Sequence, residues 1–156
     1  MMIKSIHIAV IAGAIVALSV IAYLGMQNQL QLAPSLLIGK QAKEVTIDMT
    51  TQQWRFDVVS ISDHNRARAS PSSPQGTFNN LKLTVTKGDT IVLKIKNLDV
   101  PHGFGLDEFG INTVTPPGEI TTIKFTASQE GQFTFYCTVF CGTGHPKHMG
   151  TLIVQG

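Results

Sequence analysis

Apolar side chains recur at every second position through much of the chain after residue 45, and this period limits the fold more than any other feature. The run 45–50 alternates Val, Ile and Met with Thr, Asp and Thr, and the alternation resumes over 54–58. A period of two places successive side chains on opposite faces of a strand, whereas a helix buries residues three and four apart. We therefore expect half-buried strands and no long helix in this part of the chain.

More strands of this kind are expected further along, at 81–85, 91–95, 121–127, 133–137 and 151–155. The first two of these flank Lys87-Gly88-Asp89, which predicts a strand, a tight turn and a strand. Short strands separated by Gly and Pro indicate an all-β sandwich or barrel. The segment 62–77, rich in Ser, Pro, Asn and Arg, is expected to be a mobile surface loop in which Arg66 and Arg68 are solvated.

The composition excludes several other classes of protein. With 43% apolar residues and a net charge of +2, the chain does not resemble a disordered segment, and two cysteines are too few for a disulfide-dense mini-protein. From Val45 onward, nine Lys and Arg balance nine Asp and Glu. This neutral body lacks the basic surface that nucleic-acid binding requires, so no nucleic-acid partner is expected.

Residues 8–26 carry no charge and consist mainly of Ile, Val, Ala and Leu. At about 1.5 Å per residue, this run is long enough to cross a hydrocarbon core of about 30 Å. Lys4 precedes it and the next basic residues are Lys40 and Lys43, so the positive-inside rule predicts a cytoplasmic N-terminus. We expect a single-pass protein of the cell membrane: a transmembrane helix within 1–26, a stalk at 27–44 and an extracytoplasmic domain at 45–156.

A cleaved signal peptide is the alternative for the N-terminal segment. Ala17-Leu18-Ser19 resembles a small-x-small cleavage site, but the apolar run continues beyond it through Leu24. This length favours the uncleaved anchor.

Metal-binding residue types gather near the C-terminus. Cys137, Cys141 and His145 stand four apart, and His148 and Met149 follow. Thiolate, imidazole and thioether groups in one loop suit copper or zinc. The residues alone leave three alternatives open: a disulfide between the cysteines, a structural zinc site completed by a distant histidine, or a copper site.

A second segment bears on this choice. Asp99-Val100-Pro101-His102 directly follows a predicted strand, which places a histidine in a loop at one end of the sandwich. The loops at that end would bring His102 to the cysteine loop.

Together these segments resemble the dinuclear copper (CuA) domain of cytochrome c oxidase subunit II, in its shorter, single-span bacterial and archaeal form. The resemblance covers roughly 81–154 and rests on DVPHGF at 99–104, PGE at 117–119, YCTVFCGTGH at 136–145 and GT at 150–151, with a looser echo at 54–58. It implies a cupredoxin-like Greek-key barrel or sandwich that carries two copper ions.

By this resemblance, Cys137 and Cys141 each bridge both copper ions, and His102 and His145 each bind one of them. The backbone carbonyl of Val139 is a weak ligand. Val139 also replaces an acidic residue of the family, which removes the carboxylate for an associated magnesium contact.

The last ligand departs from the family pattern. The family has a methionine three residues after the loop histidine, where this chain has His148, and Met149 stands one place later. His148 would be a harder donor that favours oxidised copper and lowers the potential. The alternatives are that the loop shifts and Met149 binds, or that neither binds and the site is mononuclear.

The resemblance also implies the function: electron transfer within a haem-copper terminal oxidase. The expected donor is cytochrome c or a small copper protein, and the acceptor is haem in a membrane-embedded catalytic subunit. This chain alone would reduce no oxygen. Two alternatives remain: a stand-alone membrane-anchored cupredoxin for copper storage or delivery, and the subunit that receives electrons in a related reductase.

Overall fold

The structure is a computed structural model that describes residues 41–70, 78 and 80–156. The predicted membrane anchor at 1–26 and most of the predicted stalk lie outside the described residues. Among the residues that are described, no helix has the length and apolar character needed to span a membrane. The part from Ala42 to Gly156 forms one compact unit.

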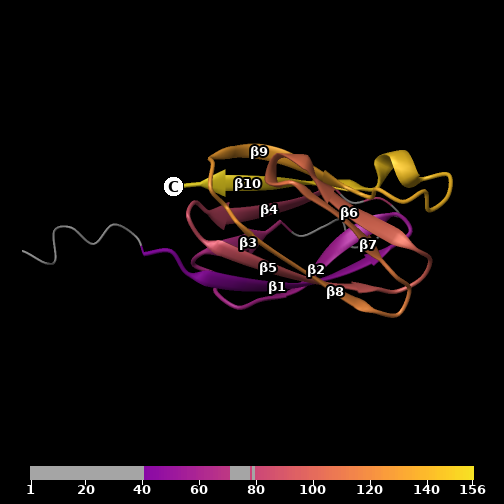
Figure 1. The fold of residues 1–156 in the computed structure, drawn as a ribbon, viewed down its shortest axis with the longest axis horizontal. Helices are drawn as coiled ribbons and strands as arrows, with labels where there is room; N and C mark the ends of the chain where they lie inside the picture. Colours follow the sequence, from indigo (N-terminus) through magenta and orange to yellow (C-terminus); the bar gives the residue numbers. More distant parts are fainter. Residues whose placement is uncertain (1–40, 71–77, 79) are drawn as a thin grey trace, which may run out of the picture. The chain divides into compact units, whose positions relative to one another are not determined.

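This unit is an all-β sandwich, as the period of two predicts. Within the described residues, one sheet has four strands in the order β2-β1-β5-β8 and the other has six in the order β3-β4-β10-β9-β6-β7. The strands are β1 (Glu44–Gln52), β2 (Arg55–Ile61), β3 (Ala67–Ala69), β4 (Leu81–Thr86), β5 (Thr90–Asn97), β6 (His102–Leu106), β7 (Ile111–Thr115), β8 (Ile120–Thr126), β9 (Gly131–Tyr136) and β10 (Met149–Gln155). Figure 1 shows the two sheets as two layers.

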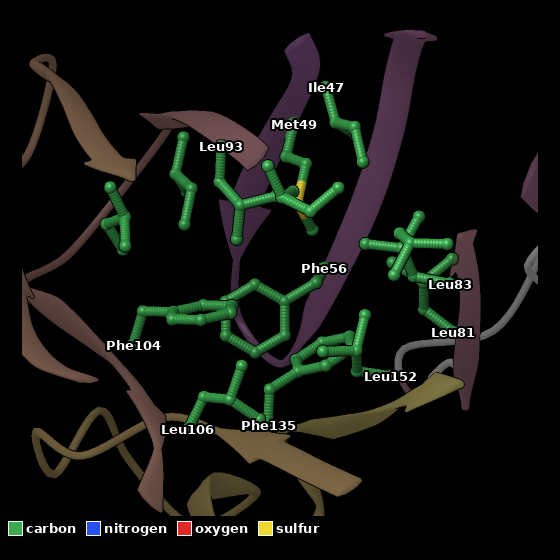
Figure 2. Close-up of a cluster of buried hydrophobic side chains, with 14 of the residues drawn as sticks. Ile47, Met49, Phe56, Leu81, Leu83, Leu93, Phe104, Leu106, Phe135 and Leu152 are labelled. Atoms are coloured by element: carbon green, nitrogen blue, oxygen red, sulfur yellow. The ribbon is translucent and has the colours of Figure 1, made fainter. Parts of the chain in front are cut away.

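The core lies between the sheets and is built by side chains that alternate along each strand. Phe56 of β2 meets Phe104 of β6 and Phe135 of β9, with ring centroids 5.6 and 5.4 Å away. Figure 2 shows these three rings meeting among aliphatic side chains from both sheets. Each ring is at most 1% exposed, so the aromatic contacts join the two layers at the centre of the unit.

The turn at 87–89 differs from the sequence prediction in what it connects. Both flanking strands are present, and Gly88 takes a positive φ of 85° in the turn. The two strands do not pair with each other, however: β4 pairs with β10 and β3, and β5 pairs with β1 and β8. The turn therefore carries the chain from one sheet to the other. The sequence did not predict this connection, because alternation does not specify which strand pairs with which.

The prediction of a solvated loop at 62–77 is wrong for its first half. Ala67–Ala69 forms the edge strand β3, and Arg66 is only 9% exposed. Its guanidinium binds the fully buried carboxylate of Asp89, which also accepts the backbone N–H of Lys43. Arg66 can be buried because its positive charge pairs with the negative charge of the Asp89 carboxylate. Residues 71–77 lie outside the described part of the chain.

Two loops meet at the end of the sandwich opposite the C-terminus (Figure 1). One joins β9 to β10 and contains the short 3-10 helix η3 (His145–Lys147); the other joins β5 to β6. Pairing between Gly105 of β6 and Tyr136 of β9 brings the first loop's start beside β6. This arrangement places the cysteine loop next to His102.

The buried ion pair yields a stability prediction. Arg66→Ala leaves the Asp89 carboxylate buried without its cation and is expected to lower the free energy of unfolding by about 3–5 kcal/mol. Arg68→Ala is the matched control: Arg68 is exposed on β3, and its loss should cost about 0.5 kcal/mol or less. Urea denaturation of the reduced, metal-free chain measures both. Equal, small effects would show that Arg66 behaves as a solvated residue.

Candidate metal centre

Four metal-binding side chains converge at the loop end of the sandwich. His102 is the first residue of β6, Cys137 follows the last residue of β9, Cys141 lies in the loop, and His148 precedes β10. One ligand atom from each of these residues lies within 4.8 Å of the others, and all four side chains are buried. We refer to these four residues as the His/Cys cluster.

The backbone fixes the ends of the cysteine loop. The Cys137 N–H donates to the His148 carbonyl at 2.9 Å, directly beyond the pairing of Tyr136 with Met149. On the facing strand, Gly103 lies so close to the loop that a Cβ would come within 2.1 Å of the Thr138 hydroxyl oxygen. Glycine at 103 therefore lets β6 approach the cysteine loop closely.

The two sulfur atoms are adjacent but not bonded. Both cysteines are free, and their Sγ atoms are 3.7 Å apart. Nδ1 of His102 lies 3.7 Å from Cys137 Sγ, and Nδ1 of His148 lies 3.7 Å from Cys141 Sγ. Each buried imidazole thus presents the same ring nitrogen to a sulfur.

Of the other predicted ligands, the structure brings two to the sulfurs and leaves one aside. Nδ1 of the half-buried His145 is 3.6 Å from Cys141 Sγ, and the carbonyl oxygen of Val139 is 3.1 Å from Cys137 Sγ. Met149 is 39% exposed and lines a separate groove with Phe78 and Lys147. His148, by contrast, is fully buried.

The second nitrogen of each buried imidazole is held by a side chain from elsewhere in the fold. Nε2 of His102 lies 2.7 Å from Asp99 Oδ1, and Nε2 of His148 lies 3.2 Å from Thr51 Oγ1. A partner on Nε2 orients the ring and leaves Nδ1 for a metal. Sequence reasoning missed both partners, although Asp99 stands three residues before His102 and Thr51 occupies an inward position of β1.

Hydrogen bonds shift the pKa values of His102 and Asp99. Burial opposes a charge on His102, but its hydrogen bonds with Cys137 and Asp99 outweigh burial and raise its pKa. Burial likewise favours the neutral form of Asp99, but the Gln53 backbone N–H and His102 lower its pKa on balance. Asp99 is therefore a carboxylate that holds the His102 ring.

Only one of the two cysteines is ionised at neutral pH in the metal-free protein. Burial opposes ionisation of Cys137, but hydrogen bonds from His102, His148 and the Gly103 N–H overcome it and lower the pKa to about 4. Burial and the adjacent charge of Cys137 raise the pKa of Cys141 to about 12. Cys137 is thus the thiolate at neutral pH.

Aromatic residues surround the cluster unevenly. The ring centroids of Phe56 and His148 are 4.3 Å apart, and both side chains are fully buried. Phe56 therefore separates the His148 ring from water on the side of the cluster that faces the core. The indole N–H of Trp54 and the Gln53 side chain both donate to the Cys141 carbonyl, at 2.9 and 2.6 Å. The loop directs Phe140 outward, where its side chain is 77% exposed beside His145.

The donor set fits copper. Two sulfurs and three imidazoles form a soft site with the ligands of copper or zinc. These five side chains, with the Val139 carbonyl beside Cys137, exceed the four ligands that a closed tetrahedral zinc site uses. The site therefore offers more donors than one closed tetrahedral ion requires.

Comparison with known proteins agrees with this chemistry. The sequence profile of the cupredoxin-like domain matches residues 14–154. Cytochrome c oxidase subunit 2 of Thermus thermophilus is 37% identical over 73 residues, which are 47% of this chain and 54% of that protein. Nitrous-oxide reductase of Stutzerimonas stutzeri is 30% identical over 120 residues, 74% of this chain and 18% of the reductase.

A solved structure shares the fold. The periplasmic domain of cytochrome oxidase subunit II (CoxB) of Bradyrhizobium japonicum superposes with a TM-score of 0.53 at 23% identity, covering 71% of this chain and 83% of that domain. The chain spans about half the length of the Thermus subunits that it matches. The resemblance to subunit II that the sequence motifs predicted is confirmed.

The charge on Cys137 can be measured directly. In the reduced, metal-free chain we expect one thiolate per molecule at neutral pH, lost as the pH falls through about 4. Because the folded pKa lies below the ordinary thiol value of 9.0, the stability that this thiolate contributes is fully present above that value and is lost progressively as the pH falls from there to about 4. Ultraviolet absorbance of the thiolate gives the titration.

Two serine variants are the controls. Cys137→Ser should abolish the low-pH thiolate, whereas Cys141→Ser should retain it, because the hydrogen-bond donors converge on Cys137. Loss of the signal in Cys141→Ser alone would reverse the assignment.

Proposed function

Because this chain belongs to the cupredoxin-like domain family, we propose that it carries a dinuclear copper centre of the CuA type and is the subunit of a haem-copper terminal oxidase that receives electrons. The observation that carries the proposal is the pair of free, buried sulfurs 3.7 Å apart with an imidazole nitrogen beside each. The cytochrome c oxidase subunits among its relatives support the same function.

In the proposed centre, Cys137 and Cys141 would supply their thiolates to both copper ions, and His102 and His145 would each bind one of them. The Val139 carbonyl is a weak ligand. His148 is the remaining ligand in preference to Met149, since His148 is buried with Nδ1 toward Cys141 and Met149 is exposed in another groove.

Two copper ions held by shared thiolates would supply a one-electron carrier whose charge change is spread over both metals. The chain's own residues keep these ligands in place. Asp99 holds the His102 ring, and the hydrogen bond from the Cys137 N–H to the His148 carbonyl closes the loop. Phe56 covers the side of the His148 ring that faces the core. Ligands that are already positioned need little rearrangement when the charge of the site changes.

The proposal includes the partners and the location. The proposed donor is cytochrome c or a small copper protein. The half-buried His145 beside the exposed ring of Phe140 supports this face of the loop as the surface where the donor binds. Electrons pass on to haem in a membrane-embedded catalytic subunit. The N-terminal run at 1–26 would anchor the chain in the cell membrane, with the copper domain outside the cytoplasm.

A related reductase is the second candidate, because the nitrous-oxide reductase of Stutzerimonas stutzeri matches a larger share of this chain than the oxidase subunit does. A stand-alone anchored cupredoxin for copper storage or delivery is the third. The stand-alone cupredoxin requires no catalytic subunit with haem.

Copper loading tests the centre. We expect two copper ions per chain and, after partial oxidation, an electron spin resonance signal from one electron shared by both. His148→Ala should alter the signal and shift the potential if His148 is a ligand, whereas Met149→Ala, one residue later, should leave both unchanged. A single copper with an unshared signal would contradict the dinuclear centre, and the reverse response of the variants would assign Met149.

Copurification tests the assembly. Tagged chain extracted in mild detergent from its native membrane should bring down a haem-containing, many-span protein, and the complex should consume oxygen with a reduced donor. A Cys137→Ser/Cys141→Ser variant that still copurifies should lose donor-dependent turnover, because it lacks the sulfurs that would hold the copper. Recovery of the chain without haem would favour copper storage, and turnover of a nitrogen oxide instead of oxygen would favour a reductase.

A further inference from the structure

The inward face of β1 carries one residue that does not match its neighbours. Val45, Ile47, Met49 and Thr51 all point into the core, and none is more than 1% exposed. Three of them are apolar and the fourth has a hydroxyl. Burying a hydroxyl is unfavourable unless it is hydrogen-bonded, so a threonine at this position calls for a partner.

That partner is the His148 ring, 97 residues away in sequence. Thr51 Oγ1 lies 3.2 Å from Nε2 of His148, whose side chain is itself fully buried. The centroid of the His148 ring lies 4.3 Å from that of the Phe56 ring and 4.9 Å from that of the nearly perpendicular His102 ring, and these two rings confine it. Both polar groups are therefore buried together at the edge of the metal site.

Packing alone does not determine which atoms of the imidazole face the sulfurs. A half-turn about the Cβ–Cγ bond exchanges Nδ1 with a carbon in almost the same volume. A hydrogen bond at Nε2 removes this ambiguity, because only one of the two orientations places Nε2 on the hydroxyl. In that orientation Nδ1 lies 3.7 Å from Cys141 Sγ.

We propose that Thr51 is a positioning residue for the metal centre: its hydroxyl holds Nε2 of His148 so that Nδ1 is presented to the site. The proposal rests on the proposed function, in which His148 is a ligand. When Nδ1 binds a metal, the ring carries its hydrogen on Nε2, which donates to the Thr51 oxygen. A methionine side chain in place of the imidazole has no N–H, so Thr51 serves specifically the histidine of this chain.

The position of Thr51 is fixed together with that of the other imidazole. The Thr51 carbonyl accepts the Leu98 N–H at 3.0 Å, and the Gln53 N–H donates to Asp99 at 2.8 Å. Asp99 in turn holds His102. The end of β1 thus ties both imidazole anchors to one rigid segment.

The test compares Thr51→Val in two backgrounds, wild type and His148→Met, using the full chain and copper(I) alone as the probe. Competition with a chromophoric chelator should show that Thr51→Val weakens copper(I) binding about ten- to a hundredfold with His148 present. Thr51→Ser should restore binding to within about threefold of wild type, since it keeps the hydroxyl. In the His148→Met background, Thr51→Val should change binding little.

Thr86→Val is the matched control, because Thr86 is also buried with one hydroxyl hydrogen bond, at the far end of β4. It should not affect copper(I) binding. Equal weakening by Thr51→Val in both backgrounds, or failure of Thr51→Ser to restore binding, would overturn the proposal. Thr51→Ala replaces Thr51→Val if the valine variant does not fold.

A metal-free arm separates this proposal from the proposed function. Urea unfolding is measured for the wild type, Thr51→Val, His148→Met and the double variant, all without metal. Thr51→Val should change the equilibrium constant of unfolding about two- to tenfold more in the wild-type background than in the His148→Met background. A chain that binds no copper would overturn the proposed function, and this coupling would still decide whether Thr51 holds the ring. Absence of the coupling would overturn the positioning role.

Discussion

The hydrogen bond from the Cys137 amide to the His148 carbonyl is the interaction on which the rest of the site depends. It lies directly beyond the last β9–β10 pair, Tyr136 with Met149, and so extends the ladder to the base of the loop. The donors between these two residues are confined to a closed loop whose ends cannot separate without breaking the sheet. The positions of the sulfurs therefore follow from the sandwich itself.

A closed loop is not sufficient, because a cluster of two sulfurs and buried imidazoles carries charge that the interior resists. Hydrogen bonds to Cys137 stabilise its negative charge. Asp99 and Thr51 hold Nε2 of the two buried imidazoles, on the side of each ring away from the sulfurs. Thr51 lies in β1 and Asp99 lies in the loop after β5, and both strands belong to the four-stranded sheet. The cysteine loop joins β9 and β10 of the six-stranded sheet. The His/Cys cluster is thus assembled across the sandwich, and its geometry depends on how the two layers pack.

The division between what the sequence predicts and what it leaves open follows from this assembly. Seven of the ten strands in the described part of the chain follow local alternation and were predicted to within about three residues. The strands β3, β6 and β7 were not predicted, and His102, expected in a loop, is the first residue of β6. Three features depend on contacts remote in sequence: the burial of Arg66 by Asp89, the separation of β4 from β5 into different sheets, and the contact of Thr51 with His148. An alternating strand shows which face is buried but not what lies opposite.

The same alternation bears on the choice between His148 and Met149. Gly150, Leu152 and Val154 of β10 face the core, and Gly150 lies so near Phe135 that a Cβ would come within 2.2 Å of its ring. A period of two then puts His148 on the inner face and Met149 on the outer one. Moving Met149 inward by a one-residue shift would turn the apolar residues of β10 to solvent and bring a bulky residue against Phe135. The register that packs the core is therefore the physical reason to expect an imidazole where the family has a thioether.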